Sequence, residues 1–264
     1  MSNSLIAIAF ILGFAGADAP SAGAGAVPPV PVPAGDPAAR ALAEGDRLEA
    51  AGEYEKAIAA YKAVLEGHGA EALWRISRAY SDMGEAAPED RQKVLFDRAV
   101  EYGREAVKAA PGSSDAHALL AVALGRKALF SSPKEGVRIS REVKAEADRA
   151  VALDKDKFLP YLVLGIWNRE ISGLGFFEKA LAKILYGGVP DASLEASAKS
   201  LERAVSLEPG ALKAHYELAV TYRELGEKEK ARKELRQVVD RRAVRALDGP
   251  LQAKAREFLR KLGG

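Results

Sequence analysis

The clearest pattern of small and apolar positions lies between Leu212 and Asp240. Such positions recur there at intervals of three and four residues, and the sequence Leu225-Gly226-Glu227 interrupts them once. They are Leu218, Ala219 and Tyr222 before the interruption, and Ala231, Leu235 and Val238 after it. Residues spaced in this way lie on one face of a helix. The stretch therefore predicts two amphipathic helices joined by a tight turn.

The same pattern can be aligned on most of the chain, with a unit of about 34 residues that is typical of tetratricopeptide repeats. We therefore predict an all-α domain over residues 38–264, built as a right-handed solenoid of tetratricopeptide-like helical hairpins with irregular repeats. The expected hairpins occupy residues 38–69, 70–113, 114–157, 158–211 and 212–245. A stack of hairpins exposes an apolar end, so we expect the C-terminal helical stretch 250–262 to cap it.

The repeats differ in length, and the differences predict local structure. Gly45 falls where two helices should cross closely, because a residue without a side chain lets the backbones approach. In the second repeat we expect a turn at Gly84-Glu85, followed by a long second helix that runs to Ala110. The fourth repeat carries the longest insertion, over residues 168–190. Unequal lengths favour a single fixed domain over an interchangeable array.

The N-terminal residues predict a targeting segment and a linker. Residues 5–17 are apolar and end in Ala15-Gly16-Ala17, a pattern typical of signal-peptide cleavage. We expect an exported protein, periplasmic or secreted, whose mature N-terminus at Asp18 would be seen by N-terminal sequencing. The alternative is a membrane anchor formed by residues 5–17, because residues 1–4 contain no Lys or Arg. Residues 18–37 are rich in Pro and Ala and predict a disordered linker.

The composition narrows the class of function. The net charge of the 264-residue chain is +2, so no overall field favours nucleic acid or a membrane. The absence of Cys excludes disulfides, thiolate metal sites and a catalytic thiol. Aromatic residues make up only 7% of the chain, which suits helices packed through small side chains better than a β-sandwich.

Three strings of residues distinguish the irregular repeats from generic tetratricopeptide sequences. They are Leu73-Trp74-Arg75-Ile76-Ser77-Arg78-Ala79, Leu164-Gly165-Ile166-Trp167, and a segment from Phe177 to Pro190 that contains Ala182-Lys183 and Leu185-Tyr186-Gly187. In order and spacing they resemble the family called regulator of microtubule dynamics, over residues 70–245. The resemblance implies a helical repeat domain that works by protein contact. In animal members it also implies microtubules and mitochondrial or endoplasmic reticulum membranes.

This chain departs from the animal arrangement at its N-terminus, and its composition, rich in Ala, Gly and Arg, looks bacterial. An exported bacterial protein would meet no microtubules. We therefore carry over the domain and not the cytoskeletal role.

The first helix of each hairpin should line the concave groove of the solenoid, where ligands usually lie. Aromatic and Arg side chains there can anchor a peptide or a carboxylate. The candidates are Trp74, Arg75, Arg78, Arg169, Tyr216 and Arg223. The alternative is that Trp74 packs under the long second helix of its repeat and that the arginines are solvated. The groove positions that a carboxylate clamp fills with Lys and Asn hold other residues, such as Asp46 and Ala118, which excludes that subtype.

The insertion in the fourth repeat predicts an amphipathic helix of about three turns. Its apolar side consists of Phe176, Phe177, Leu181, Ile184 and Leu185. Such a helix can cover the groove, pack on a partner, lie on a membrane surface or pack against its own solenoid. We favour the last, because an exposed apolar patch would promote aggregation.

Catalytic and cofactor chemistry is not indicated. His68, His117 and His215 lie in different hairpins without ligand-spaced carboxylates, so we expect no metal site and no cofactor. Residues 228–261 hold twelve Lys or Arg and five acidic residues, but without interleaved aromatics a solvated helix face is the simpler interpretation and no nucleic-acid partner is expected.

We predict a non-enzymatic interaction or scaffold module that binds a protein or peptide through the groove of first helices. One alternative is an extracytoplasmic solute-handling component associated with a membrane transporter. A large apolar cavity under the 168–190 insertion would favour that alternative. Another is a membrane- or cytoskeleton-associated adaptor, as in the resembled family.

Overall fold

The computed structural model describes residues 36–263 except 176–178, 181, 182, 186 and 189. The predicted signal peptide or anchor and nearly all of the predicted linker lie outside the described residues. Phe176, Phe177 and Leu181 of the insertion lie outside them as well. Within the described part of the chain, all regular secondary structure is helical, which confirms the predicted all-α fold.

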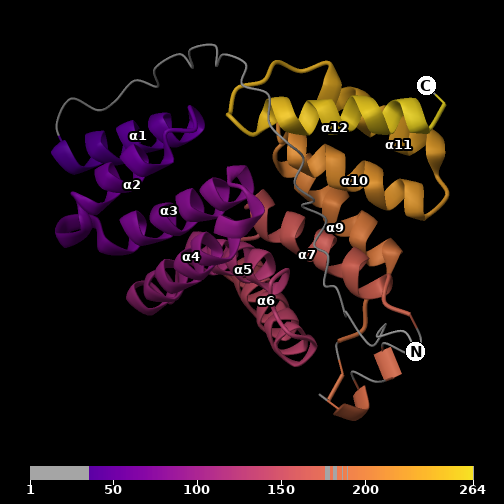
Figure 1. Cartoon of the computed structure of the whole chain (residues 1–264), viewed down its shortest axis with the longest axis horizontal. Helices are drawn as coiled ribbons and strands as arrows, with labels where there is room; N and C mark the ends of the chain where they lie inside the picture. Colours follow the sequence, from indigo (N-terminus) through magenta and orange to yellow (C-terminus); the bar gives the residue numbers. More distant parts are fainter. Residues whose placement is uncertain (1–35, 176–178, 181–182, 186, 189, 264) are drawn as a thin grey trace.

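The helices follow one another as antiparallel pairs, and each pair packs on the next (Figure 1). The pairs are α1 (Pro37–Ala50) with α2 (Tyr54–Lys62), α3 (Leu65–Ala86) with α4 (Glu89–Ala109), α5 (Ser114–Ala128) with α6 (Pro133–Leu153), α7 (Phe158–Ser172) with α9 (Leu194–Leu207), and α10 (Leu212–Glu224) with α11 (Lys228–Val239). A last helix, α12 (Asp248–Lys261), packs on both α10 and α11. The first helices of the pairs are thus α1, α3, α5, α7 and α10.

Local sequence sets where several helices begin. The side chains of Asp36, Ser113, Ser132 and Ser193 accept hydrogen bonds from main-chain amides at the starts of α1, α5, α6 and α9. Pro37 and Pro133 follow two of these caps, where a missing amide hydrogen does no harm. The tight turns after α1 and α10 use Gly52 and Gly226, whose φ angles are 81° and 80°.

Glycines inside the first helices allow the two helices of a pair to approach closely. A Cβ atom on Gly45 would lie 2.3 Å from the Tyr61 ring, which confirms the close crossing expected there. The same holds for Gly84 against Phe96 and for Gly165 against Leu201, with nearest distances of 2.4 Å.

The turn predicted at Gly84-Glu85 is wrong. Helix α3 continues through both residues to Ala86, and the chain turns at Ala87-Pro88 instead. The reason is Pro88, whose ring disfavours a helical conformation of the residue before it; Ala87 has an extended backbone with ψ 155°. The predicted long second helix agrees with α4, which runs to Ala109.

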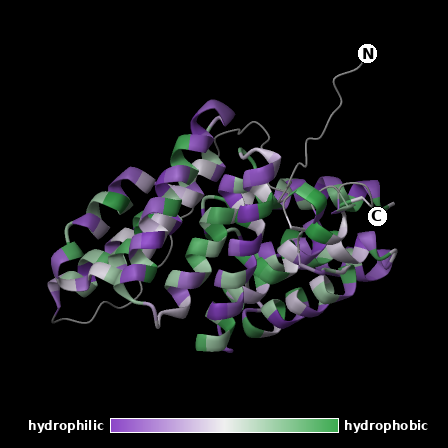
Figure 2. Ribbon diagram, turned by 90° about the horizontal axis from the view of Figure 1, so that it is seen from below, coloured by the Kyte–Doolittle hydropathy of each residue, from purple (hydrophilic) through white to green (hydrophobic). Residues whose placement is uncertain are grey.

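The core forms three successive apolar clusters along the solenoid, in which small and branched side chains of neighbouring pairs interlock. Each helix carries both hydrophobic and hydrophilic residues, as its position between a neighbour and solvent requires (Figure 2). None of the helices in the described part of the chain combines the length and apolarity needed to cross a bilayer.

Candidate functional site

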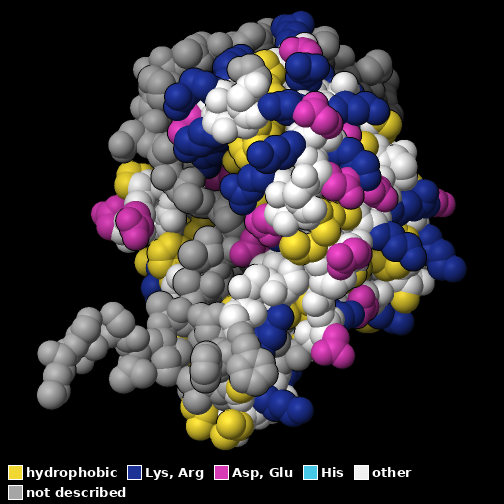
Figure 3. Space-filling model, turned by 90° about the vertical axis from the view of Figure 1, so that its right-hand side faces the viewer, with side chains coloured by type: hydrophobic (Ala, Val, Ile, Leu, Met, Phe, Trp, Pro, Cys, Tyr) yellow, Lys and Arg dark blue, Asp and Glu magenta, His cyan; other side chains and the backbone are white. Residues whose placement is uncertain are grey.

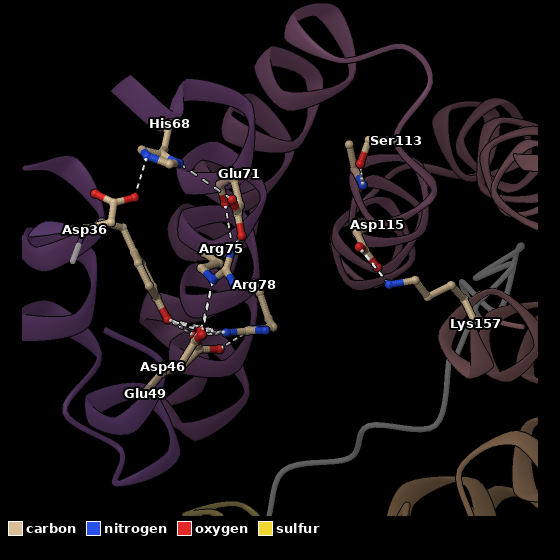
Figure 4. Close-up of polar contacts among 12 residues, drawn as sticks. Asp36, Asp46, Glu49, His68, Glu71, Arg75, Arg78, Ser113, Asp115 and Lys157 are labelled. Carbon is tan, nitrogen blue, oxygen red and sulfur yellow. Dashed lines mark hydrogen bonds and ion pairs between the residues drawn. The ribbon is translucent and has the colours of Figure 1, made fainter. Parts of the chain in front are cut away.

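The N-terminal part of the predicted groove is a cluster of charges shared by α1 and α3 (Figure 4). Arg78 donates to Asp46 at 2.6 Å and to the Glu49 carboxylate at 2.7 Å, and Arg75 pairs with Asp46 at 3.2 Å. The Glu49 side chain is only 1% exposed, and the hydroxyl of Tyr61 also donates to it at 2.8 Å. The two predicted arginines are therefore held against carboxylates of the preceding hairpin.

Trp74 belongs to the same cluster. The guanidinium carbon of Arg75 lies 4.1 Å from the centre of the Trp74 ring, and that of Arg78 lies 5.4 Å away. Burial alone would lower the pKa of Arg78, but the hydrogen bond and charge of Glu49 outweigh burial and raise it. The structure thus brings Trp74, Arg75 and Arg78 together, with Trp74 half-buried over the charge cluster.

Arg169 is placed differently from the prediction. Its side chain is only 4% exposed and pairs with Glu217 at 2.7 Å and with Glu170 at 3.0 Å. Glu217, 2% exposed, comes from α10 and also pairs with Lys213 at 2.9 Å. The prediction that Arg169 anchors a partner is therefore wrong, because the neighbouring first helix buries its guanidinium in an ion cluster.

Glu170 gives this cluster a pH dependence. Burial raises the pKa of its carboxyl to about 7, and Arg169 only partly counteracts this. Since folding raises this pKa, the stability that the protonated group contributes is fully present below about pH 4.5 and is lost as the pH rises to about 7. We expect Glu170→Gln to raise the free energy of unfolding by about 2 kcal/mol near pH 8 and to change it little near pH 4.5.

Urea unfolding of the wild-type and variant proteins across this pH range tests the Glu170 prediction. The matched control is Glu105→Gln, which removes an exposed carboxylate from α4. If the two variants showed the same pH dependence, net charge and not burial would be responsible.

The C-terminal part of the predicted groove is partly covered by α12, and Arg223 there stays exposed. Tyr216 of α10 meets Phe258 edge to face with ring centres 6.3 Å apart, and the Arg223 guanidinium lies 5.2 Å from the centre of the same ring. Tyr216 and Arg223 are brought together, but their shared contact is the last helix of the chain. The expected cap therefore packs on the groove-lining side of α10 as well as on α11.

Between these two parts, charges from α3, α5, α10 and α12 influence one another. Arg126 of α5 pairs with Glu85 of α3. Burial would raise the pKa of Glu85, but the charges of Arg126, Lys213 and Lys254 and the hydrogen bond from Arg126 together outweigh burial and lower it. The inner side of the solenoid is thus an array of acids and bases that are paired across neighbouring helices.

A connecting segment for which the sequence predicted no role completes the site. Residues 241–247, which we call the closing segment, join α11 to α12 and reach the N-terminal hairpin (Figure 1). The Ala246 amide donates to the Ala50 carbonyl at 2.8 Å, and Arg245 pairs with Asp82 at 2.8 Å and lies 3.7 Å from Glu49. The one signal for this contact was a basic, non-helical stretch beside a Gly-Pro break, which does not specify a target.

Comparison with known proteins identifies the family. The profile described as Regulator of microtubule dynamics protein 1-3 matches residues 41–263. The chain belongs to this family. The resemblance to this family that the sequence shows over residues 70–245 therefore extends to residues 41–263. This range contains almost every residue that the structure describes.

The chain is similar to several animal members. It is 26% identical to regulator of microtubule dynamics protein 1 of Bos taurus over 222 residues, which cover 83% of this chain and 70% of the bovine protein. It is 31% identical to regulator of microtubule dynamics protein 3 of Rattus norvegicus over 163 residues, which cover 61% of this chain but only 35% of the rat protein. The chain thus spans about a third of that relative.

Among solved structures, a thermophilic tetratricopeptide protein from Thermus thermophilus has a TM-score of 0.60 with 17% identity. The match covers 85% of this chain and 98% of that protein. This likeness confirms the tetratricopeptide-like solenoid and supports the fold alone. Fold and family together indicate a protein–protein interaction module, and both are typical of non-enzymatic scaffolds.

Two histidines of the regulator of microtubule dynamics domain have a structural role. His117 and His215 occupy equivalent places in their hairpins. The Nε2 atom of His117 is hydrogen-bonded to the Pro111 carbonyl at 3.0 Å, and that of His215 to the Pro209 carbonyl at 2.9 Å. Nδ1 of each meets a carboxylate of the paired helix, Glu146 or Glu234. Each imidazole thus ties a turn to both helices of its hairpin. Among the described residues, no group of three or more His, Asp or Glu could hold a metal ion.

The described part of the insertion does not pack as expected. Ile184 is 80% exposed and Leu185 is 55% exposed, so the packing against the solenoid that we favoured is wrong for these two residues. Leu174, at the start of the insertion, does pack against the core, and the far end is held by Arg141 of α6, which donates to the Gly188 carbonyl at 2.9 Å.

The basic C-terminal helices do not form a single-sign surface. Figure 3 shows this side of the molecule with Lys and Arg side chains interspersed with Asp, Glu and apolar side chains. Several of the bases are paired, as in Arg232 with Glu229 and Lys261 with Glu257. This pattern agrees with a solvated helix face.

Proposed function

We propose that this protein is a non-enzymatic module that binds a segment of a partner protein on the side lined by α1, α3, α5, α7 and α10. One observation carries the proposal. A non-helical segment of the chain itself, residues 241–247, contacts α1 and α3 through a main-chain hydrogen bond and an Arg side chain. Main-chain and anchored side-chain contacts are the means by which folded domains hold peptides.

The half-buried Trp74 is the surface group on this side best suited to anchor a partner. Aromatic residues flanked by arginine dominate binding energy at interfaces because they bury much area with little loss of conformational freedom. Arg78 is less suited to mutation, since its removal would leave the buried Glu49 carboxylate without its main cation.

Trp74→Ala provides the test of the proposed function. Proteins that crosslink to the full-length wild-type chain in its native cell should be lost or reduced more than about tenfold with the variant, as expected for a central anchor. The control is Val94→Ala, because Val94 is a 63% exposed residue on α4, outside the first helices. Circular dichroism establishes that both variants are folded. Identical sets of crosslinked partners in all three proteins would refute the proposed surface.

The solute-handling alternative gains no support from the pocket between α4 and the α5–α6 loop. That pocket has a volume of about 210 Å³ and is lined by charged and hydroxyl side chains, such as Lys93 and Ser132, together with Phe130. None of its lining residues belongs to the insertion, under which a solute carrier would be expected to have an apolar cavity. The microtubule role in the names of the relatives is theirs, and we do not assign it to this chain.

A further inference from the structure

The closing segment is shaped by α12 and presented to the N-terminal hairpins. The Asp248 carboxylate accepts hydrogen bonds from the amides of Val244 and Arg245, both at 2.8 Å. Gln252 donates to the Arg241 carbonyl at 2.6 Å and to the Val238 carbonyl at 3.0 Å. These hydrogen bonds from α12 hold the closing segment in its conformation. The conformation of the segment therefore does not depend on its contact with α1 and α3.

The contact with α1 and α3 is much lighter. It consists of the Ala246–Ala50 main-chain hydrogen bond and the Arg245 guanidinium, with Ala246 beside the turn at Gly52, where a Cβ would come within 3.0 Å of the Ala246 side chain. Arg245 remains 49% exposed and its neighbour Val244 is 51% exposed. A contact made of one main-chain hydrogen bond and one half-exposed guanidinium is small beside the apolar clusters of the solenoid, so it can open without unfolding the domain.

The surface of α1 and α3 that Arg245 contacts is suited to bind a cation. Glu49, Asp82 and Glu85 place three carboxylates at the ends of α1 and α3. Glu49 is already bound by Arg78 and Tyr61, and Glu85 is bound by Arg126, whereas the ion pair of Asp82 is with Arg245. The pKa of Asp82 is raised to about 6, chiefly by burial and in part by the charges of Glu49 and Glu85, while Arg245 acts to lower it.

The cation bound at this place is an arginine. Its Nη2 donates to Asp82 at 2.8 Å and lies 3.7 Å from Glu49, so one end of the guanidinium serves two carboxylates on different helices. The guanidinium also stays charged at any pH at which the domain is folded. The next residue then presents its amide to the Ala50 carbonyl at the end of α1.

We propose that the closing segment is an internal occupant of the partner site, and that the external ligand is a non-helical protein segment with an arginine that takes the place of Arg245. This inference rests on the proposed function and adds to it the chemistry of the ligand and a mode of regulation. An attached segment competes at an effective concentration in the millimolar range, so the intact protein binds an external segment more weakly than its site allows. Displacement of the closing segment then accompanies binding.

The test uses a fluorescent synthetic peptide of residues 240–250 and the full-length chain. Fluorescence anisotropy should show that the peptide binds the Arg245→Ala protein at least about tenfold more tightly than the wild type, because the internal competitor is weakened. A peptide with alanine at the position of Arg245 should lose this binding. Adding Asp82→Asn to the Arg245→Ala protein should also abolish it. The control protein, Arg138→Ala, loses an exposed arginine of α6 and should bind like the wild type.

Two results would overturn the inference: equal affinity of the peptide for the wild-type and Arg245→Ala proteins, or full binding by the peptide that lacks the arginine. Hydrogen exchange of the Ala246 amide gives an independent check, since its protection should fall in Arg245→Ala while the core helices stay protected. Loss of partners with Trp74→Ala together with no peptide discrimination would leave the proposed function standing and overturn only this inference. If the peptide bound the Arg245→Ala protein more tightly but Trp74→Ala lost no partners, this inference would stand and the role proposed for Trp74 would be overturned.

Discussion

Replacing Arg169 by methionine should lower the free energy of unfolding by about 3 kcal/mol or more. The substitution keeps much of the side-chain volume but leaves Glu217, only 2% exposed, and Glu170 without their shared guanidinium. A buried carboxylate that loses a cation is costly: Glu217 keeps only its contact with Lys213, and Glu170 loses the charge that offsets its burial. Chemical denaturation monitored by circular dichroism gives the free energy directly.

Two further variants separate the buried-charge effect of Arg169 from lost packing. Adding Glu217→Gln to Arg169→Met removes both charges, so the double variant should be more stable than Arg169→Met alone. Arg138→Met breaks an exposed pair with Glu135 and should change stability by no more than about 0.5 kcal/mol. A double variant less stable than Arg169→Met would show that the cluster contributes through packing and not through charge.

Gly165→Ala should also destabilise the fold strongly, by about 3 kcal/mol. The added Cβ would lie 2.4 Å from the Leu201 side chain, which is fully buried between α7 and α9 and cannot move aside. The helices would have to separate or Leu201 would have to leave its rotamer, and both disturb a close-packed core. The change in thermal midpoint and in urea unfolding measures the effect.

A second glycine provides the control for Gly165. Gly69 also lies in a helix, α3, but a Cβ there meets no atom within 4 Å, so Gly69→Ala should be neutral or stabilising by up to about 1 kcal/mol through helix propensity. Combining Gly165→Ala with Leu201→Ala should cost less than the sum of the two single changes, because the smaller side chain makes room for the new methyl group. Strict additivity would argue against the predicted clash.

Local pattern was sufficient for the architecture. The three- and four-residue spacing in Leu212–Asp240 is set by which residues face a neighbour within the same hairpin, and such contacts are close in sequence. The close crossing at Gly45 follows from the same argument. The misplaced turn in the second repeat came from treating Gly84 as a helix terminator, although Pro88 dominates the local backbone and Gly84 is needed for contact with Phe96.

The state of the charged groups could not be predicted in this way. A spacing argument places Arg169 on the inner side of α7 but does not indicate that Glu217, 48 residues later, will cover it. The same limit applies to Tyr216 and Arg223, whose contact with Phe258 depends on how α12 folds back. Whether a polar side chain on a helix face is free or paired depends on the adjacent helix, and that information is not local.

The closing segment also changes how the repeats depend on one another. A linear solenoid has two free ends, and its stability is a sum of units and nearest-neighbour interfaces, so the terminal units fray first. Here Arg245 and Asp82 join residues 163 positions apart, and Ala246 contacts Ala50, which connects the C-terminal end of the array to its first two hairpins. The two ends of the array are therefore held together by a weak contact. Unfolding of the terminal helices at either end must first break the contacts of Arg245 with Asp82 and of Ala246 with Ala50. The two ends of the described solenoid thereby lose their stability together.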